Sequence, residues 1–579
     1  MKEAVLLDAG VVTRCRRRVH LEHDPTMVDA PQAPPDPAAG QRQSDAAEHR
    51  LRVRGTLAAL HGADWVDVPA TPETTAAEAE QATLAAMRAG AKFIGNARLP
   101  IDRAGGRRGR IDLLIRADGP AVVGSGQFGY RPVLVVRHKI TDPGSGARTS
   151  PLLSPSPGRS RIDQTHKPRS QPRDQLRLAH LTHMLRACGF AAPGRALGGV
   201  IGVDADLVLW HDLEAPTWPG GRTALGEYDL RFADRLAVAR AAAAGEPALA
   251  QPSRILDCRS CPWWPVCGAA LAAARDVSLV LRGEDANALR QAGVRTVDEL
   301  AAVDPAGPAP ATLVGAPLPD AVALARAWLA DLALVRRTVD VPVPRGDVEL
   351  DIDMESFGDS GAYLWGCLLS GVDIGFGKGY RPFVTWQPLP TVDEARSFAE
   401  FWAWLKEIRA AARRRGLTFR AYCYNELAEN RWLLASADRF AGRPGVPSRV
   451  EVREFINSDD WVDLFRVVST NFLCPRGKGL KTVAPVAGFA WRDPHASGEN
   501  SMRWYRDAVA LDGGEPRLDQ RQRLLEYNED DVRATWALRG WMSSAAVTEL
   551  PYLAELLSRP TPNGAILNGA ASAARRPSG

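Results

Sequence analysis

Acidic side chains recur in two segments of the C-terminal third, at spacings that suit metal ligands. Residues 348–355 alternate apolar and acidic side chains, which predicts a strand with Asp353 and Glu355 on one face. Residues 527–538 predict a helix, on which Tyr527 and Asp531 lie one turn apart on an apolar stripe. A buried carboxylate is costly unless it is paired or bound to metal, so the two segments predict one shared cation site. The alternative is a solvated edge strand and an ordinary helix start.

A third segment lies between these two and completes a series. Residues 417–424 predict a strand, and residues 425–434 predict the helix that follows it, with Asn425 and Glu429 four positions apart. The series D-x-E, N-x3-acid, Y-x3-D resembles the three motifs of the DEDD exonuclease superfamily, in its tyrosine-containing branch. This resemblance implies a ribonuclease H-like fold for about 200 residues of the chain.

The resemblance also implies a role for each motif residue. Four acids would bind Mg²⁺ or Mn²⁺, Tyr527 would orient the attacking water, Asn425 belongs to the second motif, and Asp463 lies on the strand between the second and third motifs. The four acids are Asp353, Glu355, Glu429 and Asp531. Glu429 stands where the family normally has Asp. Two such cations roughly 4 Å apart can activate a water and stabilise the leaving 3′-oxygen of a phosphodiester.

Cysteines form a second candidate metal site. Cys258, Cys261 and Cys267 have the spacing C-x2-C-x5-C, so three thiolates within ten residues can surround one metal centre. A fourth ligand must come from elsewhere, and Cys15 is the candidate. This arrangement resembles the iron–sulfur staple of RecB-like nucleases, which implies a 4Fe-4S cluster joining both ends of a domain. A four-cysteine Zn²⁺ site and free thiols are the alternatives.

A RecB-like module should also carry a PD-(D/E)xK nuclease site. Asp112 in residues 109–115 matches the metal-binding acid of that family, and Gln175 belongs to a helix that resembles its downstream motif. Lys139 could supply the cationic residue, but residues 131–139 contain no acid. We therefore predict a weak or inactive site that holds DNA. The basic residues for this are Arg159, Arg161, Lys167, Arg169, Arg173 and Arg177, for which a solvated loop is the alternative.

Length and composition place these sites in separate domains. A chain of 579 residues with 45% hydrophobic and 24% charged residues should fold into two to four α/β or helical domains. We predict a RecB-like α/β module at 1–277, a helix-hairpin-helix-like connector at 278–340, a ribonuclease H-like α/β domain at 341–548 and a tail at 549–579 with a disordered end. Residues 24–48 and 142–173, rich in Pro and polar residues, predict loops.

The net charge of +4 is too small to establish a nucleic-acid partner. Since no apolar run approaches ~20 residues and the N-terminal apolar stretch is too short for a signal peptide, we predict a cytoplasmic protein without a membrane partner. The combined resemblance implies a metal-dependent nuclease that degrades DNA with a free 3′ end in the 3′–5′ direction, in repair or recombination. RNA is an alternative substrate. The alternative function is a catalytically inactive nucleic-acid-binding scaffold that recruits a helicase.

Overall fold

The computed structural model describes residues 4–35, 37–120, 128–203 and 206–558. Two compact units make up the chain. The N-terminal unit comprises residues 1–252 and 257–270, and the C-terminal unit comprises residues 253–256 and 271–579, so the predicted connector falls within the C-terminal unit. The predicted disordered end of the tail, from residue 559, lies outside the described residues. In the part of the chain that the structure describes, no helix combines the length and apolar character needed to cross a bilayer.

The N-terminal unit is built on one mixed sheet of eight strands in the order β1-β2-β3-β4-β9-β10-β6-β7. Two neighbouring pairs, β1 with β2 and β4 with β9, are parallel, and the other pairs are antiparallel. The strands are β1 (Trp65–Asp67), β2 (Phe93–Asp102), β3 (Arg107–Pro120), β4 (Phe128–Val135), β6 (Ala147–Pro151), β7 (Arg161–Asp163), β9 (Leu197–Ile201) and β10 (Leu207–Asp212).

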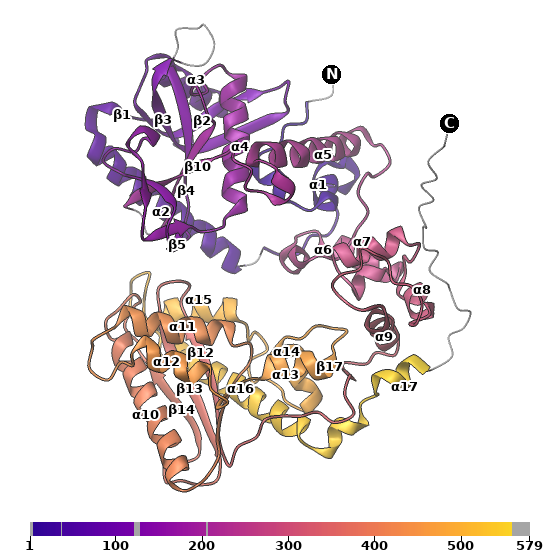
Figure 1. The fold of residues 1–579 in the computed structure, drawn as a ribbon. Coiled ribbons are helices and arrows are strands. Elements are labelled where there is room, and N and C mark those ends of the chain that lie inside the picture. Colours follow the sequence, from indigo (N-terminus) through magenta and orange to yellow (C-terminus); the bar gives the residue numbers. More distant parts are fainter. Residues whose placement is uncertain (1–3, 36, 121–127, 204–205, 559–579) are drawn as a thin grey trace, which may run out of the picture. The chain divides into compact units, whose positions relative to one another are not determined.

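Helices cover both faces of this sheet (Figure 1). On one face α2 (Pro37–His61) packs Val53 and Leu57 against Val133 and Val135 of β4. On the other face a larger apolar cluster joins the sheet to α1 (Arg16–His23), α3 (Ala76–Arg88), α4 (Pro172–Ala187) and α5 (Ala224–Ala244). The boundary with the C-terminal unit falls within α6 (Trp264–Ala273), after residue 270.

Both predicted loops are wrong in part. Helix α2 begins at Pro37, inside the expected loop at 24–48, because a proline in the first turn loses no intrahelical hydrogen bond and the alanines after it favour a helix. The expected loop at 142–173 contains β6 and β7 and most of a small two-stranded antiparallel sheet, β5 (Thr141–Pro143) with β8 (His166–Pro168). Strand β6 extends the sheet by pairing with β10, a long-range interaction that local composition does not reveal.

The C-terminal unit contains a five-stranded sheet in the order β14-β13-β12-β15-β16. Strand β12 lies at its centre, antiparallel to β13 and parallel to β15, and β15 is parallel to β16. The strands are β12 (Val348–Ser356), β13 (Ala362–Gly371), β14 (Gly379–Val384), β15 (Phe419–Cys423) and β16 (Trp461–Asp463).

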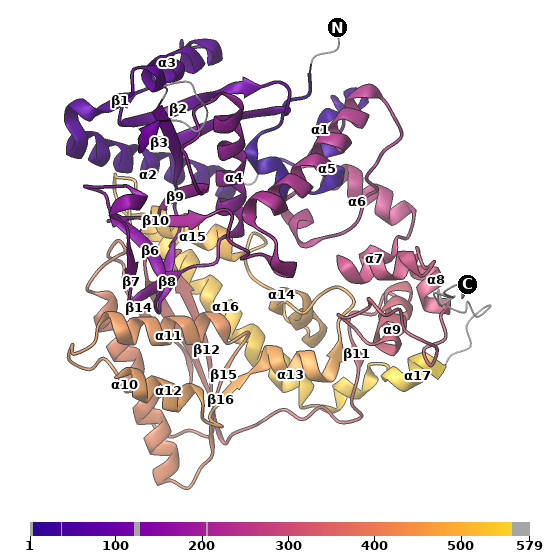
Figure 2. The ribbon, with the colours of Figure 1, turned by 45° about the horizontal axis from the view of Figure 1, so that its top comes forward.

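Two groups of helices enclose this sheet (Figure 2). One face packs on α10 (Glu394–Arg414), α11 (Leu427–Arg439) and α12 (Arg449–Ile456). The other face packs on α15 (Gly498–Ala508) and α16 (Leu518–Met542). The shorter elements after β16 are α13 (Leu464–Asn471), β17 (Phe472–Leu473), α14 (Leu480–Val483) and α17 (Leu553–Ser558).

A helical segment precedes the sheet. The predicted connector contains helices α7 (Glu284–Gln291) and α8 (Val297–Ala302), and Gly293 in the turn between them has a φ of 90°, which a residue with a side chain rarely adopts. Helix α9 (Leu318–Leu329) packs on α8 and α17, and β11 (Val335–Arg336) pairs with β17.

Candidate metal centre

Strand β12 positions the first two predicted acids. Ile352 and Met354 lie in the core that α10, α11 and α12 cover, so the alternation of the strand directs Asp353 and Glu355 to the opposite face, where α16 packs. Only 7% of Glu355 is exposed. Because β12 is the central strand of its sheet, the interpretation of these acids as the solvated face of an edge strand is wrong.

Helix α16 adds the third acid. Tyr527 and Asp531 lie one turn apart and are both buried. One carboxylate oxygen from each of Asp353, Glu355 and Asp531 lies within 4.8 Å of the other two. Among the described residues this is the one group of three Asp, Glu, His or Cys side chains that meets so closely. Three hard oxygen ligands around one point suit Mg²⁺ or Mn²⁺.

The charges at this point are not balanced by the protein. Burial, and then the charges of Asp531 and Glu355, raise the pKa of Asp353 well above its usual value. Burial and the charge of Asp531 raise the pKa of Glu355 to about 8. Burial also raises the pKa of Asp531, although the nearby ammonium group of Lys481 opposes this. Three carboxylates that repel one another in a buried place fit a divalent cation.

Three side chains connect Asp531 to its surroundings. The Lys481 Nζ, on α14, lies 3.3 Å from the Tyr527 hydroxyl oxygen and 4.5 Å from the centre of its ring. The Tyr527 hydroxyl in turn donates a hydrogen bond to Asp531. On the other side, the indole Nε1 of Trp491 donates to Asp531 Oδ1 at 2.7 Å. Lys481 and Trp491 thus fix the positions of Tyr527 and Asp531 relative to each other.

Other polar side chains hold the two strand acids. Asn528 Nδ2 donates to Asp353 Oδ2 at 2.7 Å, and the Tyr380 hydroxyl donates to Asn528 Oδ1 at 2.8 Å. The Ser501 hydroxyl donates to Glu355 Oε2 at 3.1 Å. None of these neighbours was predicted, nor were the lysine and tryptophan beside the helix acid. Of these residues, only Asn528 could have been found from the sequence, because it lies within the third motif.

Glu429 lies beside the three-acid group and not within it. It projects from α11, is 4% exposed, and its Oε2 has no hydrogen-bond partner among the described residues. Burial raises its pKa to about 8, and its charge contributes to the raised pKa values of Asp353 and Glu355. The structure therefore brings three of the four predicted acids together and leaves the fourth next to them with an unpaired buried oxygen.

The supporting residues of the second motif shape the turn before α11. Asn425 has a φ of 74°, and its backbone N–H donates to Asp463 Oδ1 at 2.9 Å. The same oxygen accepts from the Phe465 backbone N–H, so Asp463 also caps α13. Asp463 thus links the ends of β15 and β16 and fixes the direction in which α11 leaves the sheet.

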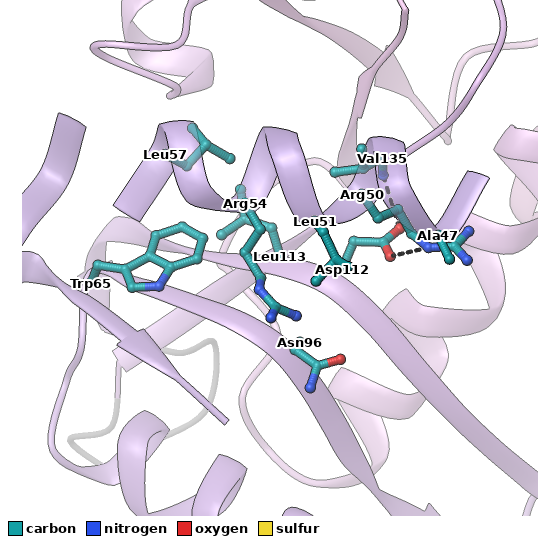
Figure 3. Close-up of a pocket in the computed structure, with 10 residues that line it drawn as sticks. All are labelled: Ala47, Arg50, Leu51, Arg54, Leu57, Trp65, Asn96, Asp112, Leu113 and Val135. Atoms are coloured by element: carbon teal, nitrogen blue, oxygen red, sulfur yellow. Dashed lines mark hydrogen bonds and ion pairs between the residues drawn. The ribbon is translucent and has the colours of Figure 1, made fainter. Parts of the chain in front are cut away.

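The predicted N-terminal site is incomplete in the structure. Asp112 on β3 accepts a hydrogen bond from the Val135 backbone N–H at 2.9 Å and lies 3.9 Å from the Nε of Arg50. Lys139 is exposed beyond the end of β4, and Gln175 accepts a hydrogen bond from the indole of Trp218. Neither lines the pocket that contains Asp112 (Figure 3).

The four predicted cysteines lie near one another. Cys15 is the residue before α1, and the others surround the start of α6. Burial, and then the charges of Cys261, Cys15 and Cys258, raise the pKa of the Cys267 thiol to about 11 against the effect of Arg17. Among the described residues the cysteines form no group of three whose sulfurs all lie within 4.8 Å.

The sheet order, the acids of its central strand and the acid of the covering helix define the C-terminal domain as ribonuclease H-like, a class whose members are usually metal-dependent nucleases. Residues 440–543 match the family model of the RNase_H superfamily. This match includes Asp463, Lys481, Tyr527 and Asp531, whereas β12 precedes it. No curated protein matches the chain. No solved structure matches it either.

Proposed function

We propose that the C-terminal unit is a metal-dependent exonuclease that removes nucleotides from the 3′ end of DNA. The observation that carries this proposal is the meeting of the Asp353, Glu355 and Asp531 carboxylates within 4.8 Å, next to a buried tyrosine. The match to the RNase_H superfamily supports a nuclease-type activity. The order of the D-x-E, N-x3-acid and Y-x3-D motifs favours the exonuclease class and its 3′–5′ direction.

Four acids would hold the cations. Asp353, Glu355 and Asp531 supply one set of oxygens, and the unpaired Oε2 of Glu429 offers a ligand for a second ion. Bound Mg²⁺ or Mn²⁺ would activate a water and stabilise the leaving oxygen of the phosphodiester. The Tyr527 hydroxyl, held between Lys481 and Asp531, is in a position to orient that water.

The test is a degradation assay on end-labelled DNA and RNA, with Mg²⁺ or Mn²⁺ and with EDTA. Asp353→Asn should abolish metal-dependent cleavage, because it weakens the oxygen set that holds the cation. Glu515→Gln removes a negative charge from an exposed loop of the same unit and serves as the matched control. Full activity of Asp353→Asn would refute the assignment.

Label position tests polarity, and substrate choice tests specificity. A 5′-labelled strand should shorten one nucleotide at a time if degradation starts at the 3′ end, whereas a 3′-labelled strand should release its label as a mononucleotide. Faster cleavage of RNA than of DNA would show that RNA is the preferred substrate, and the proposed catalytic site would be unaffected.

We propose that the N-terminal unit is a RecB-like module, and that Cys15, Cys258, Cys261 and Cys267 bind a 4Fe-4S cluster. The resemblance of the four cysteines to the iron–sulfur staple of RecB-like nucleases supports a cluster over a single Zn²⁺ ion. The two modules together suit repair or recombination of DNA in the cytoplasm.

One observation favours a second candidate function. Glu429 lies outside the three-acid group, and the N-terminal site has lost its second acid, so both sites depart from their families' patterns. A scaffold that binds nucleic acid and recruits a helicase would need neither site to cut. Metal-independent binding of DNA together with no cleavage in Mg²⁺ or Mn²⁺ would establish this alternative.

A further inference from the structure

Strand β13 has a glycine where it faces the candidate metal ligand Asp353. The register of the two strands pairs Asp353 of β12 with Gly366 of β13. Leu364 and Leu368 are the neighbours of Gly366 on the same face of β13, because every second residue of a strand points the same way. The glycine therefore leaves room for another side chain directly beside Asp353, between two leucines.

The side chain of Asn528, on α16, lies in this space. Asn528 is 0% exposed, and a Cβ added to Gly366 would overlap its Oδ1 atom. From this position Asn528 Nδ2 donates to Asp353 Oδ2 at 2.7 Å. The contact between the helix and the strand acid therefore depends on the absence of a side chain at residue 366.

Tyr380 fixes the orientation of this amide. Its hydroxyl, on the edge strand β14, donates to Asn528 Oδ1 at 2.8 Å. Burial raises the pKa of Tyr380 well above its usual value, so the hydroxyl keeps its proton and remains a donor. Because the amide oxygen of Asn528 faces Tyr380, the amide nitrogen faces Asp353. In the reversed orientation the amide oxygen would meet the carboxylate, and two acceptors would be in contact without a proton.

The hydrogen bond to Asp353 carries no charge, unlike the contact that α16 makes with the preceding acid on the same face of β12. Asp351 pairs with the Arg539 guanidinium at 2.6 Å, and this positive charge compensates the buried carboxylate. Asn528 gives Asp353 a hydrogen bond but no positive charge. Asp353 is therefore held in place while its negative charge stays available to a cation.

We propose that Asn528 is a positioning residue for cation binding, and that Tyr380 and Gly366 act through it. Asn528 orients the Asp353 carboxylate, Tyr380 orients Asn528, and Gly366 provides the space in which the amide lies. This inference rests on the proposed metal centre but not on the reaction proposed for it, because it concerns the affinity for the cation. Replacing a residue that orients a metal ligand typically lowers metal affinity by about 10- to 100-fold.

The test is Mn²⁺ binding to the full-length protein, measured from the electron paramagnetic resonance signal of unbound Mn²⁺. The variant Asp353→Asn gives the background from other sites. Asn528→Ala should weaken binding by about 10- to 100-fold.

Asn471→Ala is the matched control. Asn471 is also a buried asparagine of the C-terminal unit, donates to the Val467 carbonyl at 2.8 Å and accepts from the Thr338 hydroxyl at 2.9 Å. Its replacement should lower the unfolding temperature but change Mn²⁺ affinity less than about twofold, because it does not contact a candidate ligand. Equal Mn²⁺ affinity in Asn528→Ala and Asn471→Ala would overturn the proposal.

Two variants act on Asn528 from neighbouring strands and keep the test decisive if Asn528→Ala does not fold. Tyr380→Phe removes one hydrogen bond from the amide and should weaken Mn²⁺ binding by about 2- to 10-fold. Gly366→Ala should weaken binding as much as Asn528→Ala does, because its methyl group displaces the amide. Gly366→Ala combined with Asn528→Ala should cause no further loss, since the amide is already absent. Wild-type affinity in Tyr380→Phe, or additive losses in the combined variant, would overturn the proposal.

Cleavage assays on the same proteins separate this proposal from the proposed nuclease function. Mn²⁺ binding that depends on Asn528, in a protein that cuts neither DNA nor RNA, would support the positioning role and refute the nuclease. Slower cleavage by Asn528→Ala with unchanged Mn²⁺ affinity would overturn the positioning role and leave the nuclease in place. No binding of Mn²⁺ by the wild-type protein would overturn both.

Discussion

Replacing Arg539 by methionine tests how α16 is held on the central strand. Arg539 is 0% exposed and lies in the last turn of α16. Its guanidinium pairs with Glu349 and, at 2.6 Å, with Asp351, both on β12. Glu349 also accepts hydrogen bonds from Arg345 at 2.6 Å and from the Tyr422 hydroxyl at 2.8 Å. The same helix and strand carry the candidate metal ligands, so this ion pair network fixes the register between them.

The expected effect of Arg539→Met is large. It leaves two buried carboxylates without their shared cation, which typically destabilises a protein by about 3–5 kcal/mol. The same network also makes the stability depend on pH through Glu349. Burial alone would raise the pKa of Glu349, but the hydrogen bond from Arg345 and the charge of Arg539 hold it at about 2, below the usual 4.5. A carboxyl with a lowered pKa stabilises the fold above pH 4.5, and this contribution of about 3 kcal/mol is lost as the pH falls to 2.

Hydrogen exchange of the full-length protein, followed by mass spectrometry, measures this loss locally. Amides of β12 and α16 should exchange roughly 10²- to 10⁴-fold faster in Arg539→Met, while peptides of the N-terminal unit serve as an internal reference. The variant Arg539→Met with Glu349→Met and Asp351→Leu replaces the network by apolar side chains and should restore protection, together with metal-dependent activity. Unchanged protection in the single variant, or no recovery in the triple variant, would refute the reasoning.

Three other predictions concern the water, the metal and the cysteines. Tyr527→Phe should lower kcat by about 10- to 100-fold with little change in metal affinity, because the ring still packs but the water loses its orienting hydroxyl; cleavage rates over a Mg²⁺ titration measure both. Lys481→Gln should lower kcat by up to about 100-fold and should lower the Mg²⁺ concentration at half-saturation, because the ammonium group competes with the cation for the same acids. An unchanged Mg²⁺ concentration at half-saturation would argue against this. Cys15→Ser should lower the iron content of anaerobically purified protein and speed hydrogen exchange of the N-terminal unit but not of the C-terminal unit; normal iron would rule out this residue as a ligand.

Periodicity was a sufficient guide where alternate residues of one element point to different surroundings. Residues 348–355 form β12 with Asp353 and Glu355 on the face that α16 covers, as the alternation predicted. The helix that starts before Tyr527 continues to Met542 and buries the predicted stripe. In both segments, the spacing of apolar and acidic residues along the chain determines which side chains are buried together. The sequence alone was therefore enough to predict the face on which each of these residues lies.

The remaining parts of the site depend on contacts that no local pattern encodes. Lys481, Trp491 and Ser501 come from short helices and turns between β17 and α16, where the sequence has no strong period. The position of Glu429 depends on how α11 leaves β15, which Asp463 sets from another strand. Helix α2 was missed because its proline-rich start suggested a loop, and with it the arginines that line the N-terminal pocket.

Two half-buried aspartates in this chain show why only one of the two predicted nuclease sites should take a cation. Asp112 accepts a hydrogen bond from the Val135 backbone N–H and lies 3.9 Å from the Nε of Arg50; these oppose the effect of burial, which still raises its pKa. Asp353 receives a neutral amide from Asn528 and lies among other carboxylates, whose charges raise its pKa. The site around Asp353 therefore keeps an excess of negative charge that a divalent cation would neutralise, whereas Asp112 is the one acid among the residues that line its pocket. We therefore expect metal-dependent chemistry at the three acids of the C-terminal unit and not at Asp112.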